Sequence, residues 1–285
     1  MTGSGEKIVQ RVLAGIAFSA ITALLLITLF IVKEGLPFIF QVGPGAFLFS
    51  SDWQPQAGRF GIFPMILASI WVTLGAMVVG GPLGIAGAIF LAEFTPRPVM
   101  KVVKPTIELL AGIPSVVYGF IGVMVLAPLV RAHLGGPGLS LLGGAVILGV
   151  MILPTVVSIS IDTITAVPNS YREGSLALGA THWQTVRMAV LPAARSGILA
   201  SLILGMGRAI GETMAVIMIT GNAVKIPHSA LDSVRTLTAN IALEMGYATG
   251  LHRQALFATG VVLFVVIMIL NASASLAIRG RRKRS

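Results

Sequence analysis

Two charged side chains, Arg208 and Glu212, lie inside a long apolar stretch of the sequence, and their types and spacing point to anion chemistry. Residues four apart share one face of a helix, so both side chains are expected to point the same way. An arginine offers five fixed N–H donors that match a tetrahedral oxyanion, and Glu212 could hold the guanidinium when no anion is bound. The pair predicts an anion site or gate. The alternative is a buried salt bridge that only fixes the orientation of the helix, and both could hold in different conformational states of the protein.

A second informative segment covers residues 163–196. Ser170 and Glu173 have the spacing of a capping box, as do Thr181 and Gln184, and Gly179 between them can end the first helix. The pattern predicts a helix, a glycine turn and a second helix, with apolar contact surface supplied by Leu176, Leu178 and Trp183. On the capping pattern alone, a structured loop without any partner remains the alternative.

The sequence gives no support to several other chemistries. It contains no cysteine, and its four histidines lack metal-ligand spacing, so neither a disulfide nor a metal site is expected. No Gly-Lys dipeptide occurs, so a Walker A loop is absent, and we expect neither nucleotide hydrolysis nor a cofactor. Part of the net charge of +10 sits in a basic C-terminal tail beside an apolar span, which argues against a nucleic-acid partner.

The composition is that of a membrane protein. Hydrophobic residues make up 55% of the chain and charged residues 11%, whereas soluble domains carry roughly 25% charged residues. About 20 apolar residues in a helix span the bilayer hydrocarbon. Because a charge at the bilayer centre costs at least about 2.5–3.5 kcal/mol, Arg208 and Glu212 should face the protein interior or a watery cavity. Six stretches have the length and composition of a span: 12–32, 65–91, 106–130, 139–161, 197–220 and 255–278.

Six spans place both termini on one side of the membrane. With the basic tail in the cytoplasm, most of the 20 Lys and Arg residues lie on the cytoplasmic side, as the positive-inside rule expects. The Gly112-Ile113-Pro114 sequence predicts a helix distortion lining a pathway. We therefore expect an all-α, multi-pass membrane protein in three parts: residues 1–64 with the first helix and an outer loop, a five-helix core at 65–278 that includes a cytoplasmic loop at 167–192, and a basic cytoplasmic tail at 279–285.

The loop at 167–192 resembles the EAA loop of ABC importer permeases. Glu173, Gly179 and Leu191-Pro192 keep the spacing of that pattern, and three positions depart from it: Gly174, Ser175 and Ala189. The resemblance implies that the loop is a coupling helix. It would dock into a groove on a cytoplasmic ATPase subunit through Glu173, Leu176, Leu178 and Gly179.

A wider resemblance covers nearly all of residues 53–274. The segments 60–64, 108–119, 205–216 and 250–252 together are similar to the PstC-type permease of phosphate ABC transporters. The resemblance implies a type I ABC importer permease fold with six transmembrane helices in the cell (inner) membrane, both termini being cytoplasmic. In that family an Arg and a Glu in this span are implicated in phosphate transport, and they match Arg208 and Glu212.

The same resemblance implies a set of partners and a mechanism. A second, PstA-like permease would complete the pathway, two cytoplasmic ATPase subunits would supply energy, and an extracytoplasmic phosphate-binding protein would deliver substrate. Transport would proceed by alternating access, with ATP binding moving the coupling helices. Three alternatives are an ABC permease for another oxyanion such as sulfate or molybdate, a secondary transporter with a proton or ion site at Arg208 and Glu212, and a non-transporting membrane scaffold.

Overall fold

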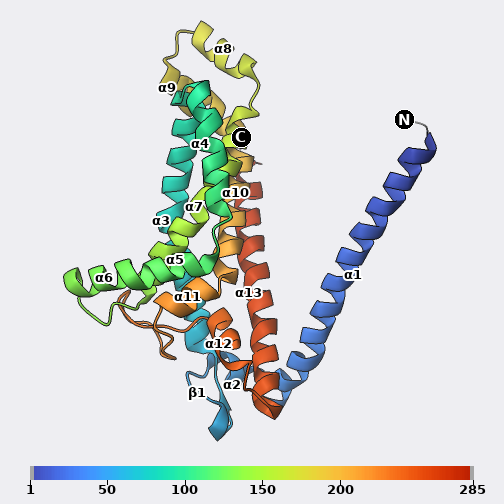
Figure 1. Cartoon of the computed structure of the whole chain (residues 1–285), viewed down its shortest axis with the longest axis vertical. Helices are drawn as coiled ribbons and strands as arrows, with labels where there is room; N and C mark the ends of the chain where they lie inside the picture. Colours follow the sequence, from blue (N-terminus) through green and yellow to red (C-terminus); the bar gives the residue numbers. More distant parts are fainter. Residues whose placement is uncertain (1–2, 283–285) are drawn as a thin grey trace.

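Three long helices pack together along the middle of the molecule, in a computed structural model that describes residues 3–282 (Figure 1). They are α3 (Phe63–Ile89), which continues as a π-helical turn over Phe90–Phe94, α7 (Leu141–Thr165) and α10 (Leu191–Gly211). Small residues let α3 and α7 approach closely, since a Cβ at Gly80 would lie 2.4 Å from the carbonyl oxygen of Gly149. A buried hydrogen bond of 2.9 Å between Ser160 and Ser201 joins α7 to α10.

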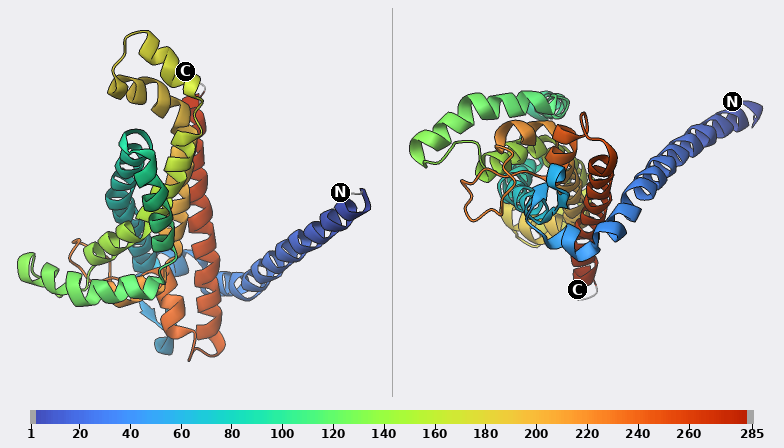
Figure 2. Two further views of the ribbon diagram at one scale, coloured as in Figure 1. Left: turned by 45° about the horizontal axis from the view of Figure 1, so that its top comes forward. Right: turned by 90° about the horizontal axis from the view of Figure 1, so that it is seen from below.

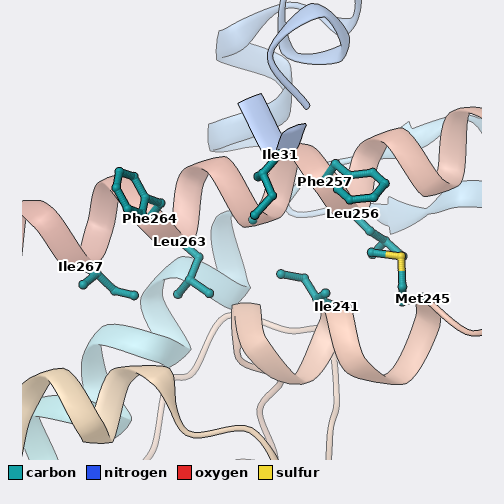
Figure 3. Close-up of a pocket in the computed structure, with 9 residues that line it drawn as sticks. Ile31, Ile241, Met245, Leu256, Phe257, Leu263, Phe264 and Ile267 are labelled. Carbon is teal, nitrogen blue, oxygen red and sulfur yellow. The ribbon is translucent and has the colours of Figure 1, made fainter. Parts of the chain in front are cut away.

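Two further long helices, α1 (Gly3–Val42) and α13 (Gly250–Arg282), meet at one end and then diverge (Figures 1 and 2). Gly35 permits their contact, because a Cβ there would lie 2.7 Å from the backbone nitrogen of Ala258. Where they separate, Ile31, residues of α13 and residues of α12 (Leu237–Glu244) line an apolar cavity of about 320 Å³ (Figure 3). Most of α1 packs against no other part of the described chain, so its apolar surface faces lipid or a partner.

The third expected span is interrupted, as the Gly112-Ile113-Pro114 sequence predicts. The helix α4 (Arg97–Ala111) lies beside α7, and the chain then changes direction into α5 (Ser115–Ile121). A π-helical turn at Gly122–Leu126 leads on to α6 (Ala127–His133), so that α5 and α6 run across the bundle (Figure 1). Pro114 has no amide hydrogen and disfavours helical geometry at Ile113, which explains the break. The third candidate span therefore begins after this break and covers Ser115–His133, whereas the sequence placed it at 106–130.

The two ends of the bundle are built differently. At one end, α2 (Pro44–Phe49), the short strands β1 (Trp53–Gln54) and β2 (Arg59–Phe60), a 3₁₀ turn at Pro55–Ala57 and α12 enclose aromatic side chains, and Trp53 pairs with Phe60 in the antiparallel register. At the other end, α8 (Asn169–Ala177) and α9 (His182–Thr185), followed by a π-helical turn at Val186–Val190, project from the bundle (Figure 1). The first described residues of α1 and the last of α13 point toward the end that carries α8 (Figure 1).

The predicted number of spans agrees with the structure. Within residues 3–282, six helices or continuous helical stretches are long and apolar enough to cross a membrane, and α7 is the most deeply buried of them. Of the predicted basic tail at 279–285, residues 283–285 lie outside the described residues, and residues 279–282 continue the α13 helix. The fifth span differs from its prediction, because it covers His182–Gly211 and ends before Glu212.

Candidate functional site

Arg208 lies in the last turn of α10 and reaches two other elements. Its Nη2 donates a hydrogen bond of 3.2 Å to the carbonyl oxygen of Ala111, the last residue of α4, and its Nη1 donates one of 3.4 Å to Thr155 Oγ1 on α7. The guanidinium therefore sits beside the break between α4 and α5. Both acceptors are neutral, so the positive charge of this half-buried group is not balanced by a carboxylate at ion-pair distance within the described chain.

Glu212 does not share a helix face with Arg208, and this part of the sequence-based prediction is wrong. Helix α10 ends at Gly211, and Glu212 has an extended backbone with φ −68° and ψ 133°. Its Oε1 accepts a hydrogen bond of 3.2 Å from the amide of Ala215, in the first turn of α11 (Met214–Ile219). A carboxylate at the start of a helix satisfies a free amide and interacts well with the helix dipole. Glu212 thus caps α11 and forms no ion pair with Arg208, both residues being described.

The two helix breaks lie close together. Helix α5, which follows the break at 112–114, packs against α11, which follows the break at Glu212, and Gly119 allows their contact. Next to this point, one face of α10 is open, since a Cβ added at Gly207 or Gly211 would meet no atom within 4 Å. Arg208 is therefore placed where two helices are interrupted, and irregular backbone at membrane depth is tolerated where it is buried in protein or lines a cavity.

Sequence reasoning missed both partners of Arg208. Thr155 follows Pro154 inside a strongly apolar helix, and a hydroxyl in such a helix was the available sign of a polar partner. The carbonyl oxygen of Ala111 can accept a hydrogen bond from Arg208 because α4 ends there. The sequence signal for that helix end was the Gly112-Ile113-Pro114 segment. No sequence pattern indicated that these two elements meet α10.

The expected helix–turn–helix at 167–192 is present. Gly179 has φ +84°, a conformation that favours glycine, and it ends α8 with its amide 2.9 Å from the carbonyl oxygen of Leu176. Thr181 and Gln184 form the predicted capping box at the start of α9. The other predicted capping box is wrong, because α8 begins at Asn169 after Pro168 and no side chain caps it. Glu173, Leu176 and Leu178 are exposed, and Leu178 is 90% exposed.

A buried ion pair that the sequence did not reveal attaches this loop to α3. Arg172 Nη2 donates a hydrogen bond of 2.7 Å to Glu93 Oε1 in the π-helical turn, and the Glu93 side chain is only 4% exposed. The Arg172 guanidinium also bonds to the carbonyl oxygens of Ile164 and Val167 at the end of α7. His182 Nε2 lies 3.0 Å from the Glu93 carbonyl oxygen. The loop is therefore fixed to two long helices.

At the opposite end, Glu244 is the centre of a buried polar cluster that sequence reasoning also missed. Its Oε1 accepts a hydrogen bond of 2.6 Å from Arg235 Nη1, and its Oε2 lies 2.9 Å from Trp53 Nε1 and 2.8 Å from His252 Nε2. The residue is 6% exposed. Since the partners come from β1, from the 220–236 connection and from α13, the cluster joins α12 to three other segments.

Comparisons with known proteins identify relatives over most of the sequence. Residues 84–283 match a family described as "Binding-protein-dependent transport system inner membrane component". The chain is 44% identical to the "Probable ABC transporter permease protein YqgH" of Bacillus subtilis (strain 168), over 90% of this chain and 85% of that protein. It is 38% identical to the "Phosphate transport system permease protein PstC" of Mesorhizobium japonicum, over 80% of this chain and 76% of that protein.

A solved structure supports the architecture. The chain has a TM-score of 0.62 and 15% identity to a chain in the "Crystal structure of a bacterial ABC transporter involved in the import of the acidic polysaccharide alginate". The alignment covers 96% of this chain and 98% of that one. At this low identity the likeness concerns the fold.

Proposed function

The chain belongs to the family of binding-protein-dependent transport system inner membrane components, and from this premise we propose that it is the transmembrane permease subunit of an ATP-driven phosphate importer. The predicted type I ABC importer permease fold, with six candidate spans, is confirmed. Relatives named as PstC phosphate transport permeases support phosphate as the substrate. The function class is thus transport, and ATP hydrolysis would belong to another polypeptide.

The observation that carries the phosphate assignment is the setting of Arg208. Its guanidinium is held by a hydroxyl and a carbonyl at 3.4 and 3.2 Å, contacts that an arriving anion can replace. Phosphate offers negatively charged oxygens, and hydrogen bonds between charged groups are shorter and stronger than neutral ones. Glu212, by capping α11, would keep the break open beside Arg208 and repel an anion that had passed it. Both residues would then belong to the substrate pathway.

The chain would form half of that pathway. The open face of α10 beside Gly207 and Gly211, together with the exposed apolar surface of α5 and α6, supports a second, PstA-like permease as the partner that covers it. An extracytoplasmic phosphate-binding protein would deliver the substrate to the end that carries Trp53 and Glu244. The complex would lie in the cell (inner) membrane with both termini cytoplasmic.

The loop at 167–192 would connect this pathway to two cytoplasmic ATPase subunits. Leu176 and Leu178 present apolar surface next to Glu173, and Gly179 fixes the turn between the two short helices. Because Arg172 joins the loop to α3 and α7, movement of the loop would be passed to the core helices. The substrate and ATP would each favour one of two states that differ in the side open to the pathway, which is alternating access.

The substrate assignment is tested by uptake of labelled phosphate at limiting concentration in cells that contain the whole transporter. We expect Arg208→Ala to reduce uptake by at least about 100-fold, because at least two charge-assisted hydrogen bonds to the anion are lost. Arg195→Ala removes an exposed arginine from the same helix and should leave uptake unchanged. Uptake by Arg208→Ala that equals the control would contradict the proposal.

The same assay separates the alternatives. Competition by sulfate or molybdate that exceeds competition by unlabelled phosphate would identify another oxyanion as the substrate. Uptake that continues without ATP and stops with an ionophore would identify a secondary transporter. A membrane scaffold would tolerate Arg208→Ala and Glu212→Ala together without loss of uptake.

The coupling role is tested by copurification. Leu178→Ser should reduce the amount of ATPase recovered with the permease in mild detergent, since an exposed apolar contact is removed. Leu134→Ser alters an equally apolar exposed residue just beyond α6 and serves as the control. Equal recovery with both variants would remove the support for docking at α8.

A further inference from the structure

A basic cavity of about 490 Å³ lies between the start of α4 and the start of α8. Arg97 and Lys101 line it from successive turns of α4, and Arg172 and Asn169 line it from α8. Leu91 and Met100 add an apolar wall. The cavity thus combines cations with apolar side chains.

Two of these cations are free of carboxylate partners. Within the described chain, Arg97 and Lys101 are exposed and take part in no ion pair. The nearby carboxylates already have other partners. Glu93 is paired with Arg172, and Asp162 is paired with Lys104, which also lies 3.9 Å from Glu108. The cavity therefore keeps an uncompensated positive charge of about two units, which favours an anion.

The position of the cavity points to the membrane surface. Leu91 belongs to the candidate span Phe63–Phe94 and lies near its end, and Thr165, which also lines the cavity, is the last residue of the candidate span Leu141–Thr165. The ends of transmembrane helices lie at the depth of the lipid headgroups. Basic pockets between transmembrane helices at this depth suit phosphate-bearing headgroups.

We propose that this cavity binds a phosphate-bearing anion, the headgroup of an anionic phospholipid, with Arg97 and Lys101 holding the phosphate group. The apolar wall at Leu91 and Met100 favours a lipid over free inorganic phosphate, because only the lipid carries acyl chains to cover it. A bound lipid would bridge α4 and α8 and would hold the loop at 167–192 against the membrane surface. This site is separate from Arg208 and does not depend on the proposed substrate.

The experiment measures lipid binding by native mass spectrometry of the full permease complex, with phosphatidylglycerol and phosphatidylcholine compared as ligands. Arg97→Gln with Lys101→Gln removes both free cations and should weaken phosphatidylglycerol binding by about 30-fold, at about fivefold for each cation. The control, Arg187→Gln with Arg195→Gln, removes two exposed cations outside the cavity and should change binding less than about threefold, because salt screens charges that do not contact the lipid.

Two further measurements separate loss of charge from loss of folding, and a lipid from a soluble anion. The exchange variant Arg97→Lys with Lys101→Arg keeps both charges and should retain binding, which separates loss of charge from loss of folding. Inorganic phosphate is titrated against bound phosphatidylglycerol in an Arg208→Ala background, so that the proposed transport site does not contribute. Retention of phosphatidylglycerol at millimolar phosphate would support a lipid as the occupant, whereas displacement would identify a soluble anion and overturn the proposal.

Two other results would also overturn the proposal. One is equal binding of phosphatidylglycerol and phosphatidylcholine by the unchanged protein. The other is an equal loss of phosphatidylglycerol in the cavity variant and in the control variant. Neither result bears on phosphate uptake, which is measured separately with Arg208→Ala, so failure of this site and failure of the proposed function are distinguishable.

Discussion

Arg208 and Arg235 are both part-buried, yet their surroundings are opposite. Arg235 donates a hydrogen bond of 2.6 Å to the buried carboxylate of Glu244 and another of 2.9 Å to the carbonyl oxygen of Asn222. Arg208 has only neutral acceptors, at 3.2 and 3.4 Å. A guanidinium matched by a fixed carboxylate is part of the structure, whereas one held by weak neutral contacts remains available to a mobile anion.

The largest expected effect on stability is at Arg235. Arg235→Ala leaves Glu244 buried without its arginine partner, and breaking such a pair costs about 3–5 kcal/mol. Thermal unfolding in detergent, followed by the fluorescence of Trp53 and the other tryptophans, should show a marked fall in Tm. Arg208→Ala should change Tm little, because that side chain has no carboxylate partner. A larger fall in Tm for Arg208→Ala would reverse our assignment of the two arginines.

Arg59→Ala is the matched control for this comparison. Arg59 also pairs with a carboxylate, Asp52, at 3.1 Å, but both side chains are more than half exposed. Exposed pairs contribute about 0–1 kcal/mol. If Arg59→Ala lowers Tm as much as Arg235→Ala, burial does not explain the importance of the Glu244 cluster.

A smaller effect is expected at the other buried pair, Arg172 with Glu93. Arg172→Ala leaves the Glu93 carboxylate without its arginine partner, but the adjoining loop is exposed, so water can reach the carboxylate once the loop moves. We expect a loss of about 2–3 kcal/mol and faster amide hydrogen exchange in α8 and α9. Arg187→Ala, an exposed change in the same region, is the control. Unchanged exchange in α8 would mean that the ion pair does not hold the loop.

Thr155→Val sharpens the assignment of Arg208 with a smaller change still. It removes one hydroxyl partner of the guanidinium while keeping the side-chain shape, and a hydrogen bond contributes about 1 kcal/mol. We expect the KM for phosphate uptake to change by about fivefold, with Tm almost unchanged. Thr163→Val is the control, since it removes a hydroxyl on the same helix that donates to the carbonyl oxygen of Ile159. Equal KM values for the two variants would show that Thr155 does not position Arg208.

The smallest effect concerns Asp232 in the 220–236 connection. Hydrogen bonds from Lys225 and from the amides of His228 and Ser229 lower the pKa of Asp232 from 3.8 to about 2. Because the folded pKa is the lower one, this stabilisation is present above pH 3.8 and is lost as the pH falls toward 2.

The measurement for Asp232 is Tm between pH 5 and about 2.5. The Tm of Asp232→Asn should fall less over this range than the Tm of the unchanged protein. The control Asp52→Asn should show the same fall in Tm as the unchanged protein. Identical pH profiles for all three proteins would contradict a role for the Asp232 carboxylate in holding the connection.

Local sequence signals predicted much of the fold. The six apolar stretches correspond to the six candidate spans because hydrocarbon thickness sets helix length directly. The helix break at Gly112–Pro114 and the turn at Gly179 also followed from the sequence, since proline chemistry and positive φ act within a few residues. The capping box of Thr181 and Gln184 was equally local.

The partners of the charged groups depended on tertiary structure. The sequence placed Arg208 and Glu212 on one helix face, but the chain leaves the helix at Gly211, so Glu212 caps α11 and Arg208 reaches Ala111 and Thr155. The pairing of Glu93 with Arg172 likewise joins residues 79 positions apart. The sequence by itself determined which segments enter the membrane and where they bend, because lipid and backbone sterics act locally. Only the packing of distant helices decided which charges are neutralised and which remain free.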